Sequence, residues 1–558
     1  DKKLKNIIIS EESKFWKFIS NKKYLNPDQI KLDLRLLEKF YLNKGFYSVQ
    51  IKNSSAIFNN NYFNLVYNID AGNIYTINET KLILPDDFDE KDFKDVEKIL
   101  SKLKGEKYSL NKLNKVVKQI DKISVSRLYD FIDASIETQI VNDNKLDIKF
   151  VVNESEKFYV KTINILGNNI TEERVIRDML EVDEGDPFNK LLHAKSINNL
   201  RARNIFAKVS TEIQDTPDKN LKNIDVMVEE KATGEILVGA GVGSEGGTAQ
   251  FSVSENNFMG KGVKLSTGLR ISEERLRGNF SIENPNFNYT EKALVTDIFI
   301  TDTDKLSDSG YSSTDAGFSL GTAFEQYDDF YFRPSFKTVY EELTTNSSAS
   351  ANLKKQEGSY FTSTIGYSFD LDKRNQRFQT SDGFRSKFTQ NIPIISESNT
   401  LLNGYQFDTF HSFNDITTSL GLYLRAVTGL SDDVRISERL KLPRKRLRGF
   451  ESGKVGPVDA NDYIGGNYAA ALNFQTNLPF IFQSFQSLDF NYFVDAGNVW
   501  GVDYSNTLDD SNEIRSSTGV GLEWFSPIGP FTFTFAQPIS KKSTDKTQSF
   551  QFNIGTTF

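Results

Sequence analysis

Several residue types are scarce in this chain, and each scarcity excludes a class of protein. The 558 residues include no cysteine, which excludes disulfide bonds, thiolate catalysis and cysteine-based metal sites. The two histidines, His193 and His411, lie far apart without a carboxylate pattern around them. No zinc signature, P-loop or nucleophile elbow occurs in the sequence. The sequence therefore predicts no enzyme, no metal site and no cofactor.

Long apolar runs are missing as well. No uninterrupted run approaches the ~18 residues of a transmembrane helix, so a helical membrane protein is excluded. The mean hydropathy of −0.44 does not exclude a membrane β-barrel, because the strands of such a barrel carry apolar residues only at alternate positions. The formal net charge of −8 argues against non-specific nucleic-acid binding.

The chain begins Asp1-Lys2-Lys3-Leu4, without the basic and then apolar segments of a signal peptide. Such a chain is cytoplasmic, or it has been processed or truncated. Aromatic residues favour the second interpretation, since 45 Phe and 22 Tyr stand beside 3 Trp. They concentrate in the second half of the chain, which is typical of the aromatic girdles of a membrane barrel.

Residues 1–232 contain an internal repeat. Alternating strand patterns occur at 63–77, 146–160 and 223–237, and Asp70, Glu154 and Glu229 mark equivalent points in them. Segments with helical periodicity lie between these patterns. The repeating unit is strand, helix, helix, strand, strand, a small α+β module.

The last repeat shows the two helices most clearly. Thr171 is the expected N-cap of the first helix, whose apolar stripe comprises Val175, Ile176, Met179 and Leu180. The second helix is expected over about 189–203 and ends at Asn204, a residue that tolerates the left-handed conformation.

Helical periodicity disappears from Gly234 onward, and alternation with a period of two replaces it. In SLDFNYFVDAG, for example, Leu488, Phe490, Tyr492 and Val494 alternate with Asp489, Asn491, Phe493 and Asp495. At ~10 residues per strand plus turns, this region accommodates roughly sixteen strands of a lipid-facing barrel. A large soluble β-sandwich or lectin-like barrel is the alternative. The terminal aromatic Phe558 argues against it, because soluble sheets protect their last strand with polar residues.

Two further patterns have competing interpretations. Gly241, Gly243 and Gly246 have the spacing of a dinucleotide-binding loop, but a strand pattern follows them where that site needs a helix. They are better explained by a first barrel strand that carries Gly239, Gly241 and Gly243 and pairs loosely with its neighbours. Asp302, Asp304 and Asp308 could bind calcium, although a solvated loop is favoured because no complete ligand loop follows.

The stretch LKLPRKRLRGFESG at 440–453 is strongly basic. It could be a nucleic-acid patch or a solvated loop, yet it lies in a long connection between barrel strands. In that position Gly449 permits a sharp turn, Phe450 can anchor the loop, and Arg448 can reach an acidic group on the barrel wall.

Four segments resemble the C-terminal part of the BamA family of outer-membrane β-barrel assembly factors: LRGF at 447–450, GGNYAAALNF at 465–474, FVDAGNVW at 493–500 and the tail 524–558. Residues 160–189 resemble the last of that family's periplasmic POTRA modules. The implied domains are POTRA modules at 1–72 (incomplete at its start), 73–156 and 157–232, followed by a transmembrane β-barrel at 233–558. Since the family normally carries more than three POTRA modules, we expect an N-terminally truncated chain.

The resemblance also implies roles for individual residues. Arg448, Gly449 and Phe450 match the motif of the sixth extracellular loop, which folds back into the barrel lumen in this family. Asp495 matches the acid on the inner wall that holds the arginine. A second acidic partner is expected where this chain has Asn473, so the chain departs from the family's pair of carboxylates.

Closing the barrel joins the first strand, about 236–243, to the last strand, 548–558. The last strand presents Phe550, Phe552, Ile554 and Phe558 on one face and Gly555 on the other. A short and weakly paired seam can open sideways and offer an edge to an incoming strand.

The resemblance implies that the incoming strands belong to unfolded outer-membrane β-barrel clients. It also implies accessory lipoproteins on the POTRA modules, outer-membrane lipid around the barrel of a Gram-negative bacterium, and POTRA modules in the periplasm. Three alternatives remain: a TamA-like assembly factor, a POTRA-bearing polypeptide translocator, and a passive porin.

Overall fold

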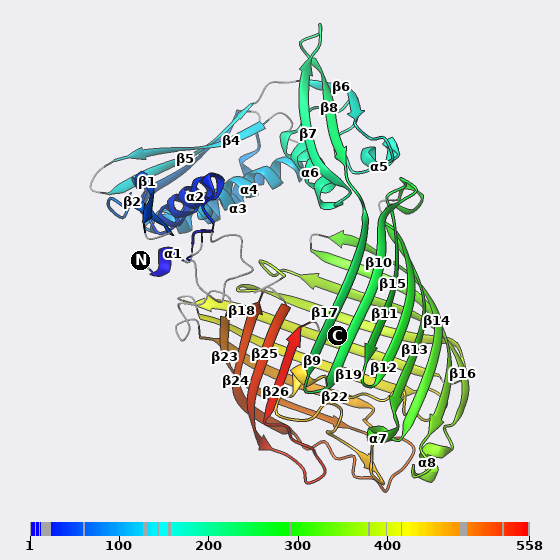
Figure 1. The fold of residues 1–558 in the computed structure, drawn as a ribbon. Helices are drawn as coiled ribbons and strands as arrows, with labels where there is room; N and C mark the ends of the chain where they lie inside the picture. The colour runs from blue at the N-terminus through cyan, green and yellow to red at the C-terminus, as the bar shows by residue number, and fades with distance from the viewer. Residues whose placement is uncertain are drawn as a thin grey trace. The chain divides into compact units, whose positions relative to one another are not determined.

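The computed structural model of the chain contains two units, which are described separately (Figure 1). One unit comprises residues 1–169 and 179–231, and the other comprises residues 170–178 and 232–558. The structure describes residues 2–5, 7–10, 12, 24–59, 62–86, 88–126, 132–141, 144–154, 158–290, 292–327, 329–377, 380–397, 399–413, 416–478, 488–526 and 529–555. Within these ranges no helix is both long enough and apolar enough to cross a membrane.

The first module contains α1 (Lys2–Lys5), α2 (Pro27–Asn43), β1 (Gln50–Asn59) and β2 (Tyr62–Asp70). The sequence specifies the start of α2 locally, because the Asn26 side chain accepts the N–H of Asp28 at 2.9 Å and Pro27 occupies the first turn. β1 and β2 form a two-stranded antiparallel sheet.

The second module contains β3 (Thr76–Ile83), η2 (Glu90–Phe93), α3 (Lys94–Leu103), α4 (Leu110–Ser126), β4 (Ile132–Ile140) and β5 (Lys145–Glu154). Its sheet has the order β3-β5-β4, with β3 parallel to β5. The apolar stripes of α3 and α4 pack on this sheet, and the fully buried core includes Phe93, Val96, Leu113, Val116 and Phe150.

The third module contains β6 (Tyr159–Leu166), α5 (Glu173–Arg177), α6 (Lys190–Ala202), β7 (Phe206–Asp215) and β8 (Leu221–Glu230), with the sheet order β6-β8-β7. The second and third modules thus share the order strand, helix, helix, strand, strand that the sequence predicts. Asn189 caps α6, and Asn204 follows this helix with a φ of 59°.

The prediction for the helix after Thr171 was wrong. Helix α5 begins at Glu173 after Glu172, which makes no side-chain cap, and it ends at Arg177, before Met179 and Leu180. The hydroxyl of Thr171 accepts instead from Nδ2 of Asn257, a residue of the barrel chain segment, at 2.9 Å. This tertiary hydrogen bond replaces the local cap that Thr171 would otherwise provide.

The second unit is built around a closed antiparallel barrel of sixteen strands, β9–β19 and β22–β26. The strands are β9 (Gly234–Gly243), β10 (Gly246–Phe258), β11 (Val263–Ser272), β12 (Arg275–Asn284), β13 (Ala293–Lys305), β14 (Tyr311–Tyr327), β15 (Phe330–Thr345), β16 (Gly358–Asp372), β17 (Gly383–Ser396), β18 (Thr400–Phe413), β19 (Ile416–Gly429), β22 (Tyr468–Asn477), β23 (Leu488–Trp500), β24 (Arg515–Ser526), β25 (Gly529–Ser540) and β26 (Phe550–Gly555). Short elements lie between them: η3 (Phe287–Tyr289), α7 (Leu306–Ser309), α8 (Ala351–Lys354), η4 (Arg444–Arg446), β20 (Val458–Asp459) and β21 (Asp462–Tyr463).

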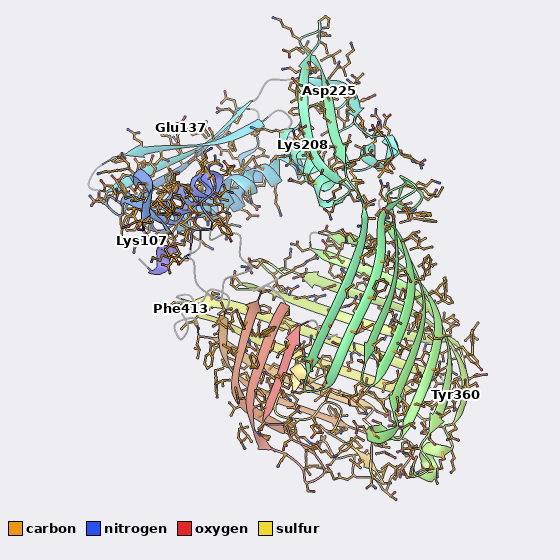
Figure 2. The ribbon with its side chains drawn as sticks, viewed as in Figure 1. Lys107, Glu137, Lys208, Asp225, Tyr360 and Phe413 are labelled. Carbon is orange, nitrogen blue, oxygen red and sulfur yellow. The ribbon has the colours of Figure 1, made fainter. Side chains whose placement is uncertain are left out.

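The barrel wall has an apolar outer face and a polar inner face, as the alternation predicts. Figure 2 shows side chains along the whole wall, with Tyr360 and Phe413 toward opposite ends of the barrel. On β23 and β24 the inward side chains Asn491, Asp495 and Ser517 are buried.

Residues 430–467, which connect β19 to β22, fold into the barrel. Leu447 and Phe450 of this connection are buried in one apolar cluster with Val427, Ala469 and Val499 of the wall. The connection is called the inner loop below.

Candidate functional site

The barrel closes through a short seam between its first and last strands. Three register pairs join β26 to β9, namely Asn553↔Gly243, Ile554↔Val242 and Gly555↔Gly241. Ten pairs, by contrast, join β9 to β10. Figure 1 shows β26 in red between β25 and the green β9. Because each ladder position contributes to pairing, this seam is the weakest junction of the barrel wall.

A serine outside the strands extends the seam. The backbone N–H of Phe552 donates to Ser244 Oγ at 2.8 Å, and the backbone N–H of Ser244 donates to the Phe552 carbonyl at 3.0 Å. Ser244 lies in the turn between β9 and β10. The Ser244 hydroxyl therefore takes the place of the backbone carbonyl that would accept the Phe552 N–H in a fourth register pair.

The start of β9, residues 234–240, carries exposed apolar side chains. In the described part of the chain, which ends at Gly555, no register pair joins residues 234–240 to β26. Ile236 and Val238 are 72% and 76% exposed on the outer face. Up to Gly555, the three register pairs of the seam therefore all lie near the β9–β10 turn.

The predicted seam residues lie as follows. Gly239, Gly241 and Gly243 occupy alternate positions of β9, in register with Gln250, Thr248 and Gly246. Phe550, Phe552 and Ile554 share one face of β26, while Phe558 lies outside the described residues. Gly555 has a φ of 85°, and a Cβ there would lie 2.5 Å from the Ala240 carbonyl oxygen, so glycine permits the close approach of the two strands.

The Arg-Gly-Phe motif of the inner loop meets the wall at Asp495. The Arg448 Nε donates to Asp495 Oδ2 at 2.7 Å, and Nη2 donates to Oδ1 at 2.8 Å. The backbone N–H of Arg448 donates to the same carboxylate at 3.1 Å. Such a bidentate, charge-assisted pair is among the strongest side-chain contacts in proteins. Gly449 follows with a φ of 89°, and Phe450 is 1% exposed.

Two further wall residues hold Arg448, and sequence reasoning missed both. Gln475 Oε1 accepts from Arg448 Nη1 at 2.9 Å. The Phe493 ring lies under the guanidinium, 3.6 Å from its carbon to the ring centre. Phe493 did carry a sequence signal, because it is an aromatic residue among the polar inward residues of β23.

Asn473, the position at which the resemblance implies a second acid, lies beside Asp495. Its Nδ2 donates to Asp495 Oδ1 at 2.8 Å and to the Arg446 carbonyl at 3.0 Å. Its Oδ1 accepts from Arg446 Nη1 at 3.3 Å, and the same nitrogen contacts Asp408 at 3.2 Å. The Asn473 amide thus orients Asp495 toward Arg448 and connects Arg446 to the same carboxylate.

The inner loop contacts β26 on one side of the seam and the β9–β10 turn on the other. Gln551 Nε2 of β26 donates to the Phe450 carbonyl at 2.8 Å, and the Gln548 N–H donates to the Gly449 carbonyl at 2.9 Å. On the other side, Arg444 Nη2 lies 2.8 Å from Glu245 in the β9–β10 turn. The loop and the seam together line a cavity of about 2150 Å³ inside the barrel.

The structure gives other roles to the glycines that suggested a dinucleotide site and to the aspartates that suggested a calcium site. Gly241, Gly243 and Gly246 belong to the β9–β10 hairpin, so the helix that a dinucleotide site requires is replaced by a strand. Asp308 pairs with Lys454 at 2.9 Å, while Asp302 and Asp304 accept from Thr314 and the Leu306 N–H. Across the residues that the structure describes, no group of three or more potential metal ligands occurs.

The fold and the seam define a class of protein, a transmembrane β-barrel preceded by POTRA modules. Residues 257–558 match the Omp85 superfamily domain, and residues 1–72 and 158–231 match POTRA, described as a surface antigen variable number repeat. The chain belongs to the Omp85 superfamily.

Individual relatives extend this finding to the whole chain. The outer membrane protein assembly factor BamA of Neorickettsia risticii is 23% identical over 100% of this chain and 76% of its own length. BamA of Neisseria meningitidis is 24% identical with the same two coverages. The crystal structure of BamA from Haemophilus ducreyi lacking POTRA domains 1–3 superposes with a TM-score of 0.64 at 21% identity, over 87% of this chain and 100% of that one.

These comparisons confirm the resemblance seen in the sequence, and they confirm the fold of POTRA modules plus a barrel. The chain is an outer-membrane protein with its POTRA modules on the periplasmic side.

Proposed function

We propose that this chain folds β-barrel proteins and inserts them into the outer membrane through the seam between β9 and β26. Its BamA relatives are named outer membrane protein assembly factors. The observation that carries the mechanism is the seam itself, which has three register pairs up to Gly555, against ten between β9 and β10.

Strand pairing explains how such a seam assists folding. A barrel strand in lipid must pair its backbone groups, because each unpaired group costs several kcal/mol there. The free edge of β9 offers those partners to a client strand by β-augmentation. A client strand at this edge pairs one of its two sides with β9, which lowers the number of unpaired backbone groups before the client barrel closes.

The work is non-enzymatic in this proposal. The free energy comes from the client's own folding, and the chain lowers a kinetic barrier only. The wall glycines Gly239, Gly241 and Gly243 keep the ladder of β9 weak, because they carry no side chains to pack across strands. The Arg448–Asp495 pair holds the inner loop in place while the seam moves.

The POTRA modules receive clients and accessory lipoproteins in this proposal. Their three-stranded sheets have β3 and β4 as edge strands in the second module and β6 and β7 in the third, and the starts of β3 and β6 pair with residues 105–108 and 185–188. An extended peptide can pair with such an edge. We assign the modules to residues 1–72, 73–156 and 157–232, and the barrel to 233–558.

A disulfide across the seam tests the function, because the chain has no cysteine of its own. Val242 and Ile554 are directly opposed in the seam, so V242C/I554C can lock it. The protein is placed in lipid vesicles, and the folding rate of a denatured outer-membrane barrel protein is measured with the disulfide oxidised and then reduced. We expect acceleration only in the reduced state.

The matched control is A240C/A249C, a pair of opposed outer-face residues on β9 and β10. It introduces the same chemistry but leaves the seam free, so the client should fold equally fast in both redox states. Equal acceleration with the seam locked would contradict the lateral mechanism. No acceleration in either state, together with steady ion conductance, would indicate a passive porin.

A further inference from the structure

A second buried ion pair lies outside the motif already described. Arg515, the first residue of β24, is 2% exposed. Its Nε donates to Asp545 Oδ2 at 2.9 Å, and its Nη2 donates to Oδ1 at 3.1 Å. Nη1 donates to the Glu513 carbonyl at 2.9 Å and to the Asn498 side chain. The side chains of both partners are almost fully removed from solvent.

Asp545 lies in the connection 541–549, which leads from β25 into β26. Its Oδ2 also accepts the N–H of Lys542 at 2.7 Å, so the carboxylate fixes the turn of this connection as well as contacting Arg515. A buried, bidentate and fully bonded carboxylate holds its backbone at one position along the barrel axis.

From Asp545 onward the chain is held continuously until β26 begins. The Lys546 carbonyl accepts from the Glu451 N–H at 3.0 Å, and the Gln548 N–H donates to Gly449 at 2.9 Å. Gln551 then contacts the Phe450 carbonyl. The position of Asp545 is thus transmitted along an extended segment to Asn553, Ile554 and Gly555, the residues that pair with β9.

The aromatic pattern of β26 does not set its register against β25 by itself. Phe550, Phe552 and Ile554 repeat with a period of two, and they oppose Phe535, Phe533 and Phe531 of β25, which repeat in the same way. A shift of two residues therefore keeps aromatic or aliphatic side chains opposite one another and on the same face. On the β9 side, Gly241 and Gly243 carry no side chains, and the restriction there comes from Gly555, where a Cβ would lie 2.5 Å from the Ala240 carbonyl oxygen.

We propose that Arg515 and Asp545 are positioning residues that set the register of β26 against β9, and thereby fix the end of the seam near the β9–β10 turn. Of the three register pairs, Gly555↔Gly241 then opens first, because it is the pair farthest from the β9–β10 turn. This inference rests on the proposed function only in treating the seam as the working edge.

The register of β26 against β9 is measured with two cysteine pairs, which are introduced into the full chain in the absence of a client. V242C/I554C reports the native register. V242C/F552C reports a shift of two residues, because diagonal neighbours about 7–8 Å apart in a ladder are too distant for a disulfide. Each pair is combined with Asp545→Asn, which removes the charge but keeps the shape of the side chain.

We expect the chain that retains Asp545 to form the native disulfide only. Asp545→Asn should raise the shifted disulfide about tenfold, the ratio that follows from losing a coupling of the usual size for contacting charges. The double change Arg515→Asp with Asp545→Arg should return the shifted product toward its starting level. Asp509→Asn is the matched control, since Asp509 pairs with Lys542 near the same connection but its side chain is 69% exposed.

Three results would overturn the inference: a shifted disulfide that stays at its starting level in Asp545→Asn, an equal rise in Asp509→Asn, or a parallel loss of both disulfides. If Asp545→Asn does not fold, Arg515→Lys, which keeps the positive charge, takes its place. The native and shifted disulfides are then measured with the same two cysteine pairs and judged by the same criteria. The client-folding assay is run separately. A register shift without any client acceleration would contradict the proposed function but not the positioning role.

Discussion

The guanidinium carbon of Arg448 lies 3.6 Å from the centre of the Phe493 ring, and the ring itself is fully buried. The same arginine forms two hydrogen bonds with Asp495, whose side chain is also fully removed from solvent. One face of the guanidinium is thus shielded by an aromatic ring while its edge is saturated by a carboxylate. Shielding of this kind strengthens both interactions relative to water.

Arg448→Ala should destabilise the barrel and release the inner loop. Removing one partner of a buried pair costs about 3–5 kcal/mol, and contact with the wet cavity reduces this to about 2 kcal/mol here. The free energy of unfolding in urea and the protease resistance of residues 430–467 measure the effect. Arg444→Ala is the control, because its partner Glu245 has a side chain that is 55% exposed and such pairs contribute at most about 1 kcal/mol. Wild-type stability in Arg448→Ala would refute the role of the pair.

Asn473→Asp should destabilise the chain although it restores an acid at this position. The carboxylate would face Asp495 Oδ1 and the Arg446 carbonyl, where the amide now donates two hydrogen bonds. We expect a loss of about 1–3 kcal/mol, the usual cost of unsatisfied buried groups, measured as a lower midpoint in urea. Gln475→Glu is the contrasting variant, since its Oε1 already accepts from Arg448 and a charge there strengthens that contact. Equal effects of the two variants would contradict this account.

Ser244→Ala should loosen the seam without affecting the rest of the barrel. The change removes the acceptor of the Phe552 N–H, and one such hydrogen bond contributes about 1 kcal/mol. With V242C/I554C in place, the disulfide should form more slowly in Ser244→Ala because the two strands separate more often. Ser252→Ala on β10, which pairs with β9 and β11, should leave the rate unchanged. A similar slowing in both variants would show that the hydroxyl has no specific role.

The third POTRA module should lose stability in mild acid. Burial lowers the pKa of His193 below its usual value, and its Nε2 lies 3.0 Å from Thr211 Oγ1. Below about pH 6.5 the unfolded chain then binds a proton that the folded module excludes, so stability falls as the pH falls. The protection factors of the amides in α6 and β7 should therefore fall between about pH 7.5 and about pH 5.5, as read by hydrogen–deuterium exchange after correction for the intrinsic rate.

His193→Phe is the matched variant for this measurement, because it fills the site beside Phe188 without a titrating group. Its exchange should show a smaller acceleration over the same pH range after correction for the intrinsic exchange rate. The other histidine, His411, has a side chain that is 81% exposed, and His411→Phe should behave as the wild type. An unchanged pH dependence in His193→Phe would exclude the histidine as the cause.

Local patterns in the sequence predicted most of the framework. Alternation placed Asp495 on the inner face of β23, and the strand and helix periods predicted the order of elements in the modules, because both depend on residues close together in the chain. The same patterns predicted α6 and its end at Asn204. They failed at Thr171, where a hydrogen bond to Asn257 replaced the local cap.

Partners that are remote in sequence account for what was missed. Ser244 and Phe552 are 308 positions apart, and nothing in the turn sequence identifies the serine as part of the seam. Gln475, Gln551 and Arg515 are ordinary polar residues of barrel strands until the inner loop and the connection 541–549 are placed against them. Only the closed barrel brings these groups together.

The three-pair seam also determines how the protein can release what it has made. When a client strand occupies β9, the displaced β26 remains tethered through residues 541–549 and competes for the same edge. Tethered partners reach effective concentrations in the mM range, so a client strand is expelled once its own barrel can close without β9. Under the proposed mechanism, the last strand of the barrel is thus a built-in competitor, which would prevent product inhibition and permit repeated turnover.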